Sequence, residues 1–365
     1  MTQRQSRPRV SVIVNTYNHD RFVIQALRSV AEQDFPACET EIIVVDDGST
    51  DATSQVLNEF LPLIRYIRKE NGGQVSAFNA GIGVARGEIL AFLDGDDWWS
   101  TNKLSRVVAA FDANPNLAAV GHGYYEVTEN GAITATISPE MTCHLNLESS
   151  SDARRSAPFR IFLGTSRLAV RASVMPQVLP VPTDLPFFDN FVFTQAIAIG
   201  GAEILPEHLC YYRIHSSSMY AGDVTDRKRL WTRYDLLCAL LEHLPRRLLR
   251  LGVPEDAIFA LLESDFVDRD RLKLILKGGT PLETFRVERA DFQISYSEST
   301  LAYRCFKALG LLMALSMPPG VFYKMRDCYA RYNLKRFRRW MGEASPSSPL
   351  VMRRRSKTKA DPADA

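Results

Sequence analysis

The sequence has few cysteines and no long apolar run. Its six cysteines are scattered without a Cys-x-x-Cys pair, so neither a disulfide framework nor a thiolate zinc site is predicted. The longest apolar run, 308–317, is about half of the roughly 20 residues that a membrane-spanning helix needs. The run at 10–14 is too short for the core of a signal peptide. We therefore expect a cytoplasmic protein with reduced thiols and no transmembrane helix.

Two common phosphate-binding motifs are also missing. Neither a Gly-x-x-x-x-Gly-Lys-Ser/Thr loop nor a Gly-x-Gly-x-x-Gly element follows any predicted strand, which removes the usual support for P-loop hydrolysis and for dinucleotide redox chemistry. The chain has 365 residues, of which 46% are hydrophobic. A composition of this kind indicates a globular protein with a large core, and excludes disordered and fibrous classes.

The first third of the chain alternates short β-branched runs with helical patterns, which is typical of a parallel sheet covered by helices. Three of these runs are apolar on both faces, as buried parallel strands are: 10–14, 41–45 and 88–93. The pattern then changes to a hairpin around Asn130-Gly131, which predicts antiparallel pairing. The sequence therefore predicts an α/β fold with a Rossmann-like, mixed sheet flanked by helices.

Only helical patterns follow residue 223, so a helical C-terminal appendage is expected. We predict an α/β domain at 1–222, a helical region at 223–342 and a disordered basic tail at 343–365. The polar stretch 138–157 is interpreted as a mobile loop or lid. Four helices are predicted in the C-terminal region: 227–249, 254–276, 300–315 and 320–340.

Acidic side chains follow two of the predicted strands. Asp46-Asp47-Gly48 ends one, and Asp94-Gly95-Asp96-Asp97 ends another. Ligands of open α/β sheets bind at the carboxyl ends of the strands, where these acids would meet. Two charges about 4 Å apart repel by about 4 kcal/mol at an effective dielectric constant near 20. A divalent cation, Mg²⁺ or Mn²⁺, relieves this repulsion and commonly binds through one or two carboxylates and a substrate diphosphate.

The order and spacing of four segments resemble those of the inverting nucleotide-sugar glycosyltransferases of family 2, which have the GT-A fold. The resemblance is close along residues 10–108 and continues, thinner, to about residue 219. The segments are Val-Ile-Val-Asn-Thr-Tyr-Asn at 12–18, Val-Val-Asp-Asp-Gly-Ser-Thr-Asp at 44–51, Asn-Gly-Gly at 71–73 with Asn-Ala-Gly-Ile at 79–82, and Leu-Asp-Gly-Asp-Asp-Trp at 93–98.

The resemblance implies roles for individual residues in donor binding. Thr16 and Tyr17 would line the uridine pocket, and Asp47 would accept a hydrogen bond from the base with Asp46 as its support, or with these two roles exchanged. Asn79 is a further donor-binding residue, with helix capping as the alternative.

The segment Asp94-Gly95-Asp96 occupies the place of the family's Asp-x-Asp motif. Asp96 would lie near the ribose, and Asp97 or Asp94 would hold the metal. His215, within a matching stretch at 211–215, would complete the metal shell or contact diphosphate, with a structural role as the alternative.

The catalytic base is assigned to Asp189. Inverting transfer needs one group to take the proton of the acceptor hydroxyl, and the family usually presents a Glu-Asp pair at the start of a helix about eleven residues before a glycine. Asp189 stands eleven residues before Gly200, but Phe188 replaces the usual Glu. Asp184 is the alternative base, and a plain N-cap is the alternative role for Asp189.

The positive charge of the chain is concentrated at its C-terminal end. Residues 324–365 hold twelve basic and four acidic residues. Residues 320–341 combine apolar and basic side chains at largely helical spacing, a pattern that suits either an anionic membrane surface as a partner or packing on the protein itself. We expect no nucleic-acid partner, because the basic tail lacks aromatic support.

These features predict a metal-dependent inverting glycosyltransferase that moves a sugar from a nucleotide-diphosphate donor, expected to be a UDP-sugar, to an acceptor hydroxyl. The acceptor would be a glycan or a lipid-linked molecule in bacterial-type surface polysaccharide or glycolipid assembly. The enzyme would be cytoplasmic and peripheral at the inner face of the membrane. The alternative function is a catalytically silent scaffold that binds nucleotide sugar.

Overall fold

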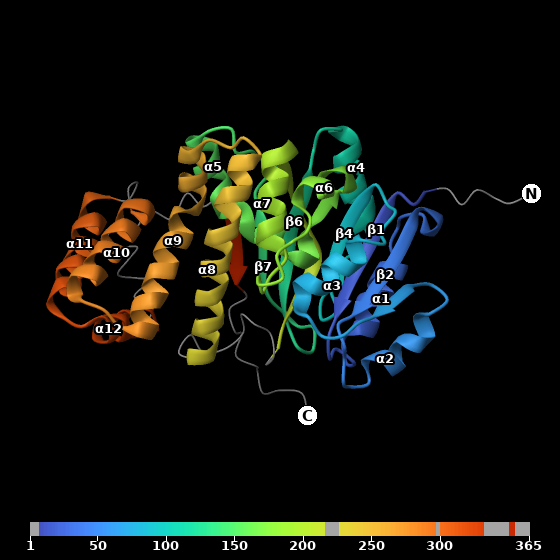
Figure 1. Ribbon diagram of the computed structural model, residues 1–365, viewed down its shortest axis with the longest axis horizontal. Coiled ribbons are helices and arrows are strands. Elements are labelled where there is room, and N and C mark those ends of the chain that lie inside the picture. Colours follow the sequence, from blue (N-terminus) through green and yellow to red (C-terminus); the bar gives the residue numbers. More distant parts are fainter. Residues whose placement is uncertain (1–6, 216–225, 297–299, 332–349, 355–365) are drawn as a thin grey trace, which may run out of the picture.

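A central sheet with helices around it makes up most of the molecule, and further helices extend it at one end (Figure 1). The computed structural model describes residues 7–215, 226–296, 300–331 and 350–354. The mixed α/β fold predicted from the sequence is confirmed, as is the helical nature of the C-terminal region.

Eleven described strands form one sheet. Its path runs β11-β7-β6-β9-β4-β1-β2-β3, and β10 lies off this path, paired with β5, β6 and β8. The pairs β1–β2, β1–β4, β2–β3 and β6–β10 are parallel, whereas β9 runs antiparallel to both β4 and β6. The bounds are β1 Val10–Thr16, β2 Thr40–Asp46, β3 Arg65–Arg68, β4 Ile89–Asp94, β5 Trp98–Trp99, β6 Ala119–Thr128, β7 Ile133–Pro139, β8 Cys143–Leu145, β9 Ala169–Arg171, β10 Ala202–Ile214 and β11 Leu350–Arg354.

The helices of the first 215 residues bury apolar stripes against this sheet. In α1 the buried residues Val23, Ala26, Leu27 and Val30 recur at helical spacing, as an amphipathic helix requires. The helix α3 packs against β1 and β2. The bounds are α1 Val23–Ala31, α2 Thr53–Val56, α3 Gly73–Ile82, α4 Lys103–Ala113, α5 Ser150–Ser156, α6 Met175–Val178 and α7 Asp189–Gly200.

The C-terminal helices contribute to two cores. Side chains of α8 (Arg227–Arg250) and of the first half of α9 (Glu255–Lys277) join the main core with the sheet. The end of α9 forms a separate small core with α11 (Leu301–Ser316) and α12 (Pro319–Arg331). An ionic network also joins these helices, because the buried Glu288 of α10 (Pro281–Ser295) pairs with Arg271 of α9 at 3.0 Å and with Arg326 of α12 at 2.9 Å.

The structure corrects three expectations. Residues 138–157 are not one loop, because they contain the end of β7, β8 and α5. The helix α10 was not predicted, since its buried residues, Thr284 and Glu288, are polar and leave no apolar stripe in the sequence, although Thr280 and Glu283 form a capping box at its start. A disordered tail is wrong for Leu350–Arg354, which pair with β7 as β11.

The remaining predictions for the C-terminal end are untested. The expected domain boundary at 222 and the rest of 343–365 lie outside the described residues, as does 332–341 of the expected membrane helix. The boundaries of the three regions therefore remain predictions.

Gly48 shapes the turn that follows β2. Its φ is +83°, and a Cβ built on it would lie 2.9 Å from the backbone nitrogen of Asn71. Gly252, between α8 and α9, has a φ of +82° but no atom within 4 Å of such a Cβ. A side chain at either position would therefore meet backbone strain, and a side chain at position 48 would also clash with the backbone of Asn71.

We expect Gly48→Ala to destabilise the protein more than Gly252→Ala. The left-handed backbone alone costs a non-glycine residue about 1–2 kcal/mol, and the contact with Asn71 adds to that cost at Gly48. Urea unfolding of both variants measures the difference. Equal losses would contradict the close approach of the two chain segments.

Candidate active site

The acidic clusters meet at one edge of the sheet, as predicted. Thr16, the last residue of β1, is in register with Asp46 of β2, and Asn15 is in register with Asp94 of β4. The backbone continues this arrangement beyond the strands, because Asp47 N–H donates to the Thr16 carbonyl at 2.9 Å and Gly95 N–H donates to the Asn15 carbonyl at 2.8 Å. The end of β1 therefore lies between the two clusters.

Asp46 is a buried support of the β2 turn. Its carboxylate accepts hydrogen bonds from the Ser49 N–H and from the Tyr66 hydroxyl, both at 2.8 Å. Burial and the hydrogen bond to Asp46 raise the pKa of Tyr66, which keeps its proton on the phenol. These contacts fit the supporting role predicted for Asp46.

Asp47 binds the start of α3. Its carboxylate accepts from the Lys69 ammonium at 2.6 Å, from Gly73 N–H at 2.7 Å and from Gly72 N–H at 3.1 Å. An anion at the N-terminus of a helix is stabilised by the free N–H groups there. Asp47 thus fixes the position of α3 beside β2, and its predicted contact with a nucleotide base remains a prediction.

Three buried polar atoms around the end of β1 have no hydrogen-bond partner among the described residues: Asn15 Oδ1, Thr16 Oγ1 and His19 Nδ1. A Cβ on Gly95 would lie 2.9 Å from both Thr16 Oγ1 and His19 Nδ1, so glycine is needed here for close approach and not for a turn. Tyr17 beside them is 41% exposed. Buried polar atoms normally have partners, and a bound ligand would supply them at this site.

His215 contacts Asp96. Its Nε2 lies 3.0 Å from Asp96 Oδ2, and the Nε2 of His19 lies 4.0 Å from the same oxygen. Burial acts to raise the pKa of Asp96, but the hydrogen bond with His215 and the charges of the two histidines outweigh it, and the pKa lies below its ordinary value. Asp96 is therefore an ionised carboxylate next to an imidazole, with 20% of its side chain exposed.

Asp97 and Asp94 are less accessible. Asp97 is 2% exposed and accepts the Arg213 N–H at 2.8 Å, and burial with the charge of Asp96 raises its pKa to about 7. Burial, together with the charges of Asp96 and Asp97, raises the pKa of Asp94 well above its ordinary value. The sequence paired His215 with Asp94 or Asp97 and placed Asp96 near the ribose. The structure instead places His215 against Asp96, because β10 carries it there.

Asp189 stands at the first position of α7 and faces the same site. Its carboxylate accepts the Thr165 N–H at 3.2 Å and the Asn190 N–H at 2.6 Å. Burial raises the pKa of Asp189, against the effect of these hydrogen bonds and of the Arg167 charge. Gln74 Nε2 lies 2.9 Å from Asp94 Oδ1 and 3.4 Å from Thr165 Oγ1, so Thr165, which binds Asp189, also adjoins the contact of Asp94. The charge of Asp189 acts to raise the pKa of Asp94.

The alternative base is placed elsewhere. Asp184 is 61% exposed and its carboxylate lies 2.9 Å from His243 Nε2 of α8. Its partner is therefore on the C-terminal helices.

The aromatic residue that replaces the family's usual Glu is part of the core. Phe188 is fully buried and lies 4.8 Å, between ring centroids, from both Phe78 of α3 and Phe92 of β4. Phe78 and Phe92 are in turn edge to face at 5.4 Å. Apolar packing thus takes the place of a polar contact immediately before Asp189.

Gln74 was missed by the sequence analysis. Its Nε2 donates to Asp94 Oδ1 at 2.9 Å, and its Oε1 accepts the Phe188 N–H at 3.2 Å. One side chain in the first turn of α3 therefore joins the acidic motif after β4 to the residue that precedes Asp189. The spacing Asn71-Gly72-Gly73-Gln74 marks the helix start, but the two contacts are remote in sequence and no local pattern predicts them.

Buried cations lie behind the acids. Lys103 donates to the Ser166 carbonyl at 2.8 Å and lies 3.5 Å from the ring centre of Trp99, and burial lowers its pKa well below the ordinary value. Arg167 stacks 4.2 Å above Tyr124, and its charge acts to lower the pKa of both Asp97 and Asp189. The segment Thr165–Arg167 thus links these cations with Asp189.

Comparison with known proteins now decides the family. The family model described as glycosyl transferase family 2 matches residues 11–169. An uncharacterised glycosyltransferase of Nostoc sp. is 32% identical over 228 residues, which cover 60% of this chain and 70% of the relative. An uncharacterised protein of Mycobacterium tuberculosis is 31% identical over 242 residues, covering 64% of this chain and 67% of the relative. The chain belongs to glycosyltransferase family 2.

A solved structure supports the fold of this glycosyltransferase. The crystal structure of Staphylococcus aureus TarS 1–349 in complex with UDP has a TM-score of 0.54 and 19% sequence identity, and covers 87% of this chain and 91% of that chain. At this identity the likeness shows the fold alone, which is GT-A-like with a mixed sheet. The protein is therefore a family 2 glycosyltransferase with a GT-A-like fold.

The side chain of Asn79 in this transferase contacts the backbone of Val181 and not the acidic residues. Its amide nitrogen donates to the Val181 carbonyl at 2.9 Å and its amide oxygen accepts the Val181 N–H at 3.3 Å. The side chain thus ties α3 to the segment before α7. It neither caps the helix nor contacts another predicted donor-binding residue in the described part of the chain.

The residues at the sheet edge fit a hard divalent cation. Carboxylate oxygens suit Mg²⁺ or Mn²⁺, and Asp96 supplies such oxygens beside the imidazole of His215. Among the described residues, no group of three His, Cys, Asp or Glu side chains could hold an ion. Such a site needs further oxygen ligands, which a substrate diphosphate and water commonly provide.

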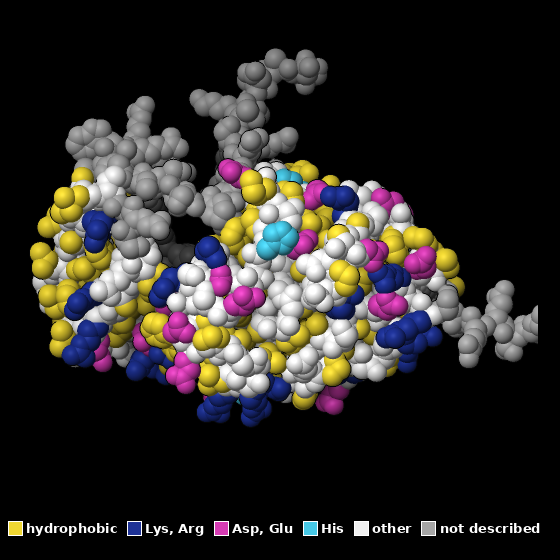
Figure 2. Space-filling model, turned by 90° about the horizontal axis from the view of Figure 1, so that it is seen from above, with side chains coloured by type: hydrophobic (Ala, Val, Ile, Leu, Met, Phe, Trp, Pro, Cys, Tyr) yellow, Lys and Arg dark blue, Asp and Glu magenta, His cyan; other side chains and the backbone are white. Residues whose placement is uncertain are grey.

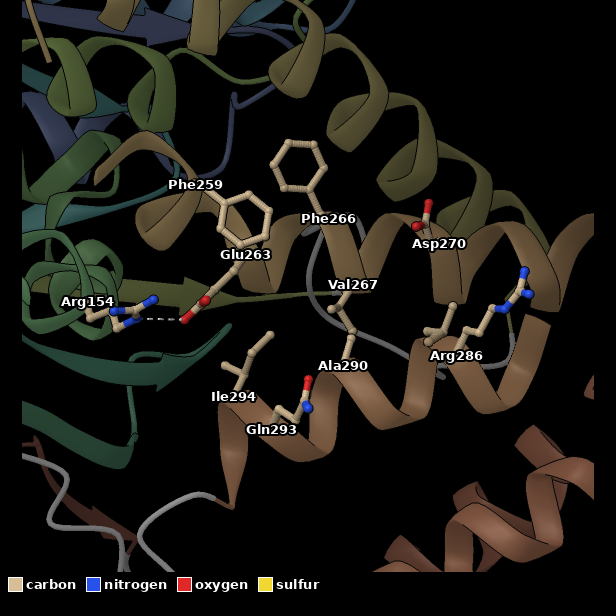
Figure 3. Close-up of a pocket in the computed structure, with 11 residues that line it drawn as sticks. Arg154, Phe259, Glu263, Phe266, Val267, Asp270, Arg286, Ala290, Gln293 and Ile294 are labelled. Carbon is tan, nitrogen blue, oxygen red and sulfur yellow. Dashed lines mark ion pairs between the residues drawn. The ribbon is translucent and has the colours of Figure 1, made fainter. Parts of the chain in front are cut away.

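A hollow of about 580 Å³ lies apart from these residues, between α9 and α10. Val267 of α9 points toward Ala290 of α10, and Arg154 of α5 forms an ion pair with Glu263 at one end of the hollow (Figure 3). None of the strand-end acids lines it, so this hollow is not the transfer site.

We expect Gln74→Leu to slow the transferase without unfolding it. The variant keeps the side-chain size and removes both hydrogen bonds, and loss of such an orienting contact to a metal-site carboxylate typically costs about 10- to 100-fold. Release of nucleoside diphosphate from the donor measures turnover. A fall in kcat with little change in the donor KM separates positioning from simple loss of binding.

The control for Gln74 is Gln55→Leu, at an exposed glutamine of α2. It should leave kcat unchanged. If both variants behave alike, Gln74 does not orient the acids.

Proposed function

We propose that the protein is a metal-dependent inverting glycosyltransferase that transfers a sugar from a UDP-sugar to the hydroxyl group of a glycan or lipid-linked acceptor. The observation that carries this proposal is the meeting of Asp96 and His215 with Asp94 and Asp189 at one sheet edge, joined through Gln74. Inverting transfer requires both a site for the leaving diphosphate and a base on the acceptor side.

Asp96 and His215 would hold Mg²⁺ or Mn²⁺, with Asp94 as the nearest further carboxylate. The bound ion would supply Lewis-acid stabilisation of the negative charge on the leaving diphosphate. Asp97 would have a supporting role. Its carboxylate accepts the backbone N–H of Arg213 and thereby fixes β10 against the turn at residues 94–97. The aromatic pair of Trp98 and Tyr211, stacked at 4.9 Å, holds the same turn.

Asp189 would act as the base. Its carboxylate takes the proton of the acceptor hydroxyl, and the oxygen attacks the anomeric carbon from the face opposite the diphosphate. The bond from that carbon to the diphosphate oxygen breaks, and UDP leaves with the electron pair. A carboxylate whose pKa is raised by burial is a stronger base than an exposed one. The Thr165 and Asn190 N–H groups hold it in place.

The donor pocket would lie around the end of β1. The unpartnered Thr16 hydroxyl and the exposed Tyr17 ring are available to a nucleoside, and Asp47 is adjacent. The fold match to TarS structures solved with UDP and with UDP-GlcNAc supports a uridine nucleotide. Bacterial relatives such as the poly(ribitol-phosphate) β-N-acetylglucosaminyltransferase TarS, 38% identical over 106 residues, support a role in assembling a surface polymer or glycolipid.

A catalytically silent nucleotide-sugar-binding scaffold is the alternative function. The reason for considering this alternative is that Phe188 stands where the family usually has Glu. The packing of Phe188 with Phe78 and Phe92 gives that replacement a structural reason that leaves Asp189 in position. Turnover separates the two functions.

We expect Asp189→Asn to lower turnover by about 10²- to 10⁴-fold, the usual contribution of a positioned base. The amide has nearly the same shape but cannot accept the proton. UDP affinity should stay near that of the parent protein, because Asp189 serves the acceptor side. Release of UDP from the donor and calorimetric titration of UDP measure the two effects.

The matched control is Asp184→Asn, which changes an exposed carboxylate five residues earlier in the chain. It should keep full turnover. Equal turnover in Asp189→Asn and the parent would remove Asp189 from the mechanism, and an inactive parent that still binds UDP would favour the scaffold.

A further inference from the structure

The helix α11 exposes apolar side chains where a surface helix normally carries polar ones. Five of its large apolar residues are exposed: Leu301, Leu309, Leu312, Met313 and Leu315. At 100° per residue they fall on one half of the helix, and Tyr303 and Ala314, which are buried, lie on the other half. We call the exposed half the α11 face.

The surface continues onto α12, where Val321 and Met325 are exposed. Figure 2 shows hydrophobic side chains gathered at the end of the molecule that α10–α12 form, interspersed with Lys and Arg. In the sequence, residues 300–326 contain no Asp or Glu. Arg326 pairs with the buried Glu288, which leaves Arg304, Lys307 and Lys324 as the cations beside the exposed apolar residues.

We propose that the α11 face and the start of α12 bind an anionic lipid bilayer, with α11 lying in the plane of the membrane. The apolar side chains would enter the boundary of the acyl chains, and the cations would remain among the anionic headgroups. At 16 residues α11 is too short to span a bilayer, and none of the described helices is both long and apolar enough to cross one. The three cations Arg304, Lys307 and Lys324 within this surface favour an anionic lipid surface over a second copy of the chain, whose own cations would repel them.

This inference goes beyond the proposed function, because membrane binding needs no donor, metal or base. It also changes the element responsible. The sequence pointed to residues 320–341, whereas the exposed apolar surface begins at Leu301 on α11. If the proposed function holds, binding here would bring the enzyme to a lipid-linked acceptor.

The test is co-sedimentation of the full chain with vesicles of phosphatidylcholine alone or of phosphatidylcholine with phosphatidylglycerol. We expect binding to the anionic vesicles and little binding to the neutral ones. The double variant Leu309→Glu with Leu312→Glu should lower the affinity for anionic vesicles at least about tenfold, since each leucine loses its transfer from water to the acyl boundary. Both side chains are exposed, so the fold should survive, which circular dichroism checks.

The matched control is Leu63→Glu with Leu249→Glu, two exposed leucines outside this surface, and it should bind like the parent. Absence of binding to anionic vesicles, or equal loss in both double variants, would overturn the proposal. The proposal would also be overturned if the parent protein formed a dimer, did not bind vesicles, and became monomeric in the Leu309→Glu with Leu312→Glu variant. Titration of UDP with Mn²⁺ should be the same in all variants, which separates failure here from failure of the proposed function.

Discussion

The structure depends on the crowding of carboxylates at the carboxyl ends of parallel strands. Asp46, Asp47, Asp94, Asp96 and Asp97 converge there because β2 and β4 both pair in parallel with β1. The protein relieves the crowding in different ways at different acids. Asp47 is paired with Lys69 and two backbone N–H groups, Asp46 is hydrogen-bonded inside the turn, and Asp97 gains a raised pKa through burial.

Asp96 remains as the ionised carboxylate nearest the unpartnered polar atoms. His215 and His19 lie next to its carboxylate, and the guanidinium of Arg213 donates to the Asp96 backbone carbonyl at 2.8 Å and interacts with its charge. A site of this kind accepts additional positive charge more readily than additional negative charge. That preference connects the fold with the proposed chemistry, because a nucleotide diphosphate can bind here once a cation accompanies it.

Much of the fold and part of the site were predictable from the sequence. The apolar runs ending in Asp46 and Asp94 placed the strands and the acids, because strand direction alone brings such ends together. Long-range contacts were not predictable. Gln74 bonds to both Asp94 and Phe188, and His215 lies against Asp96, only because α3 and the end of β10 lie next to the turn after β4. In the sequence, Phe188 departs from the family's usual Glu, and in the structure its side chain is part of the hydrophobic core.

The central claim is that a divalent cation makes this acidic edge able to bind a diphosphate. Calorimetric titration of UDP into the protein, with Mn²⁺ or with a chelator in its place, tests it most directly. The account predicts that Mn²⁺ raises the affinity for UDP at least about tenfold, or ~1.4 kcal/mol. Equal affinity under both conditions would contradict it.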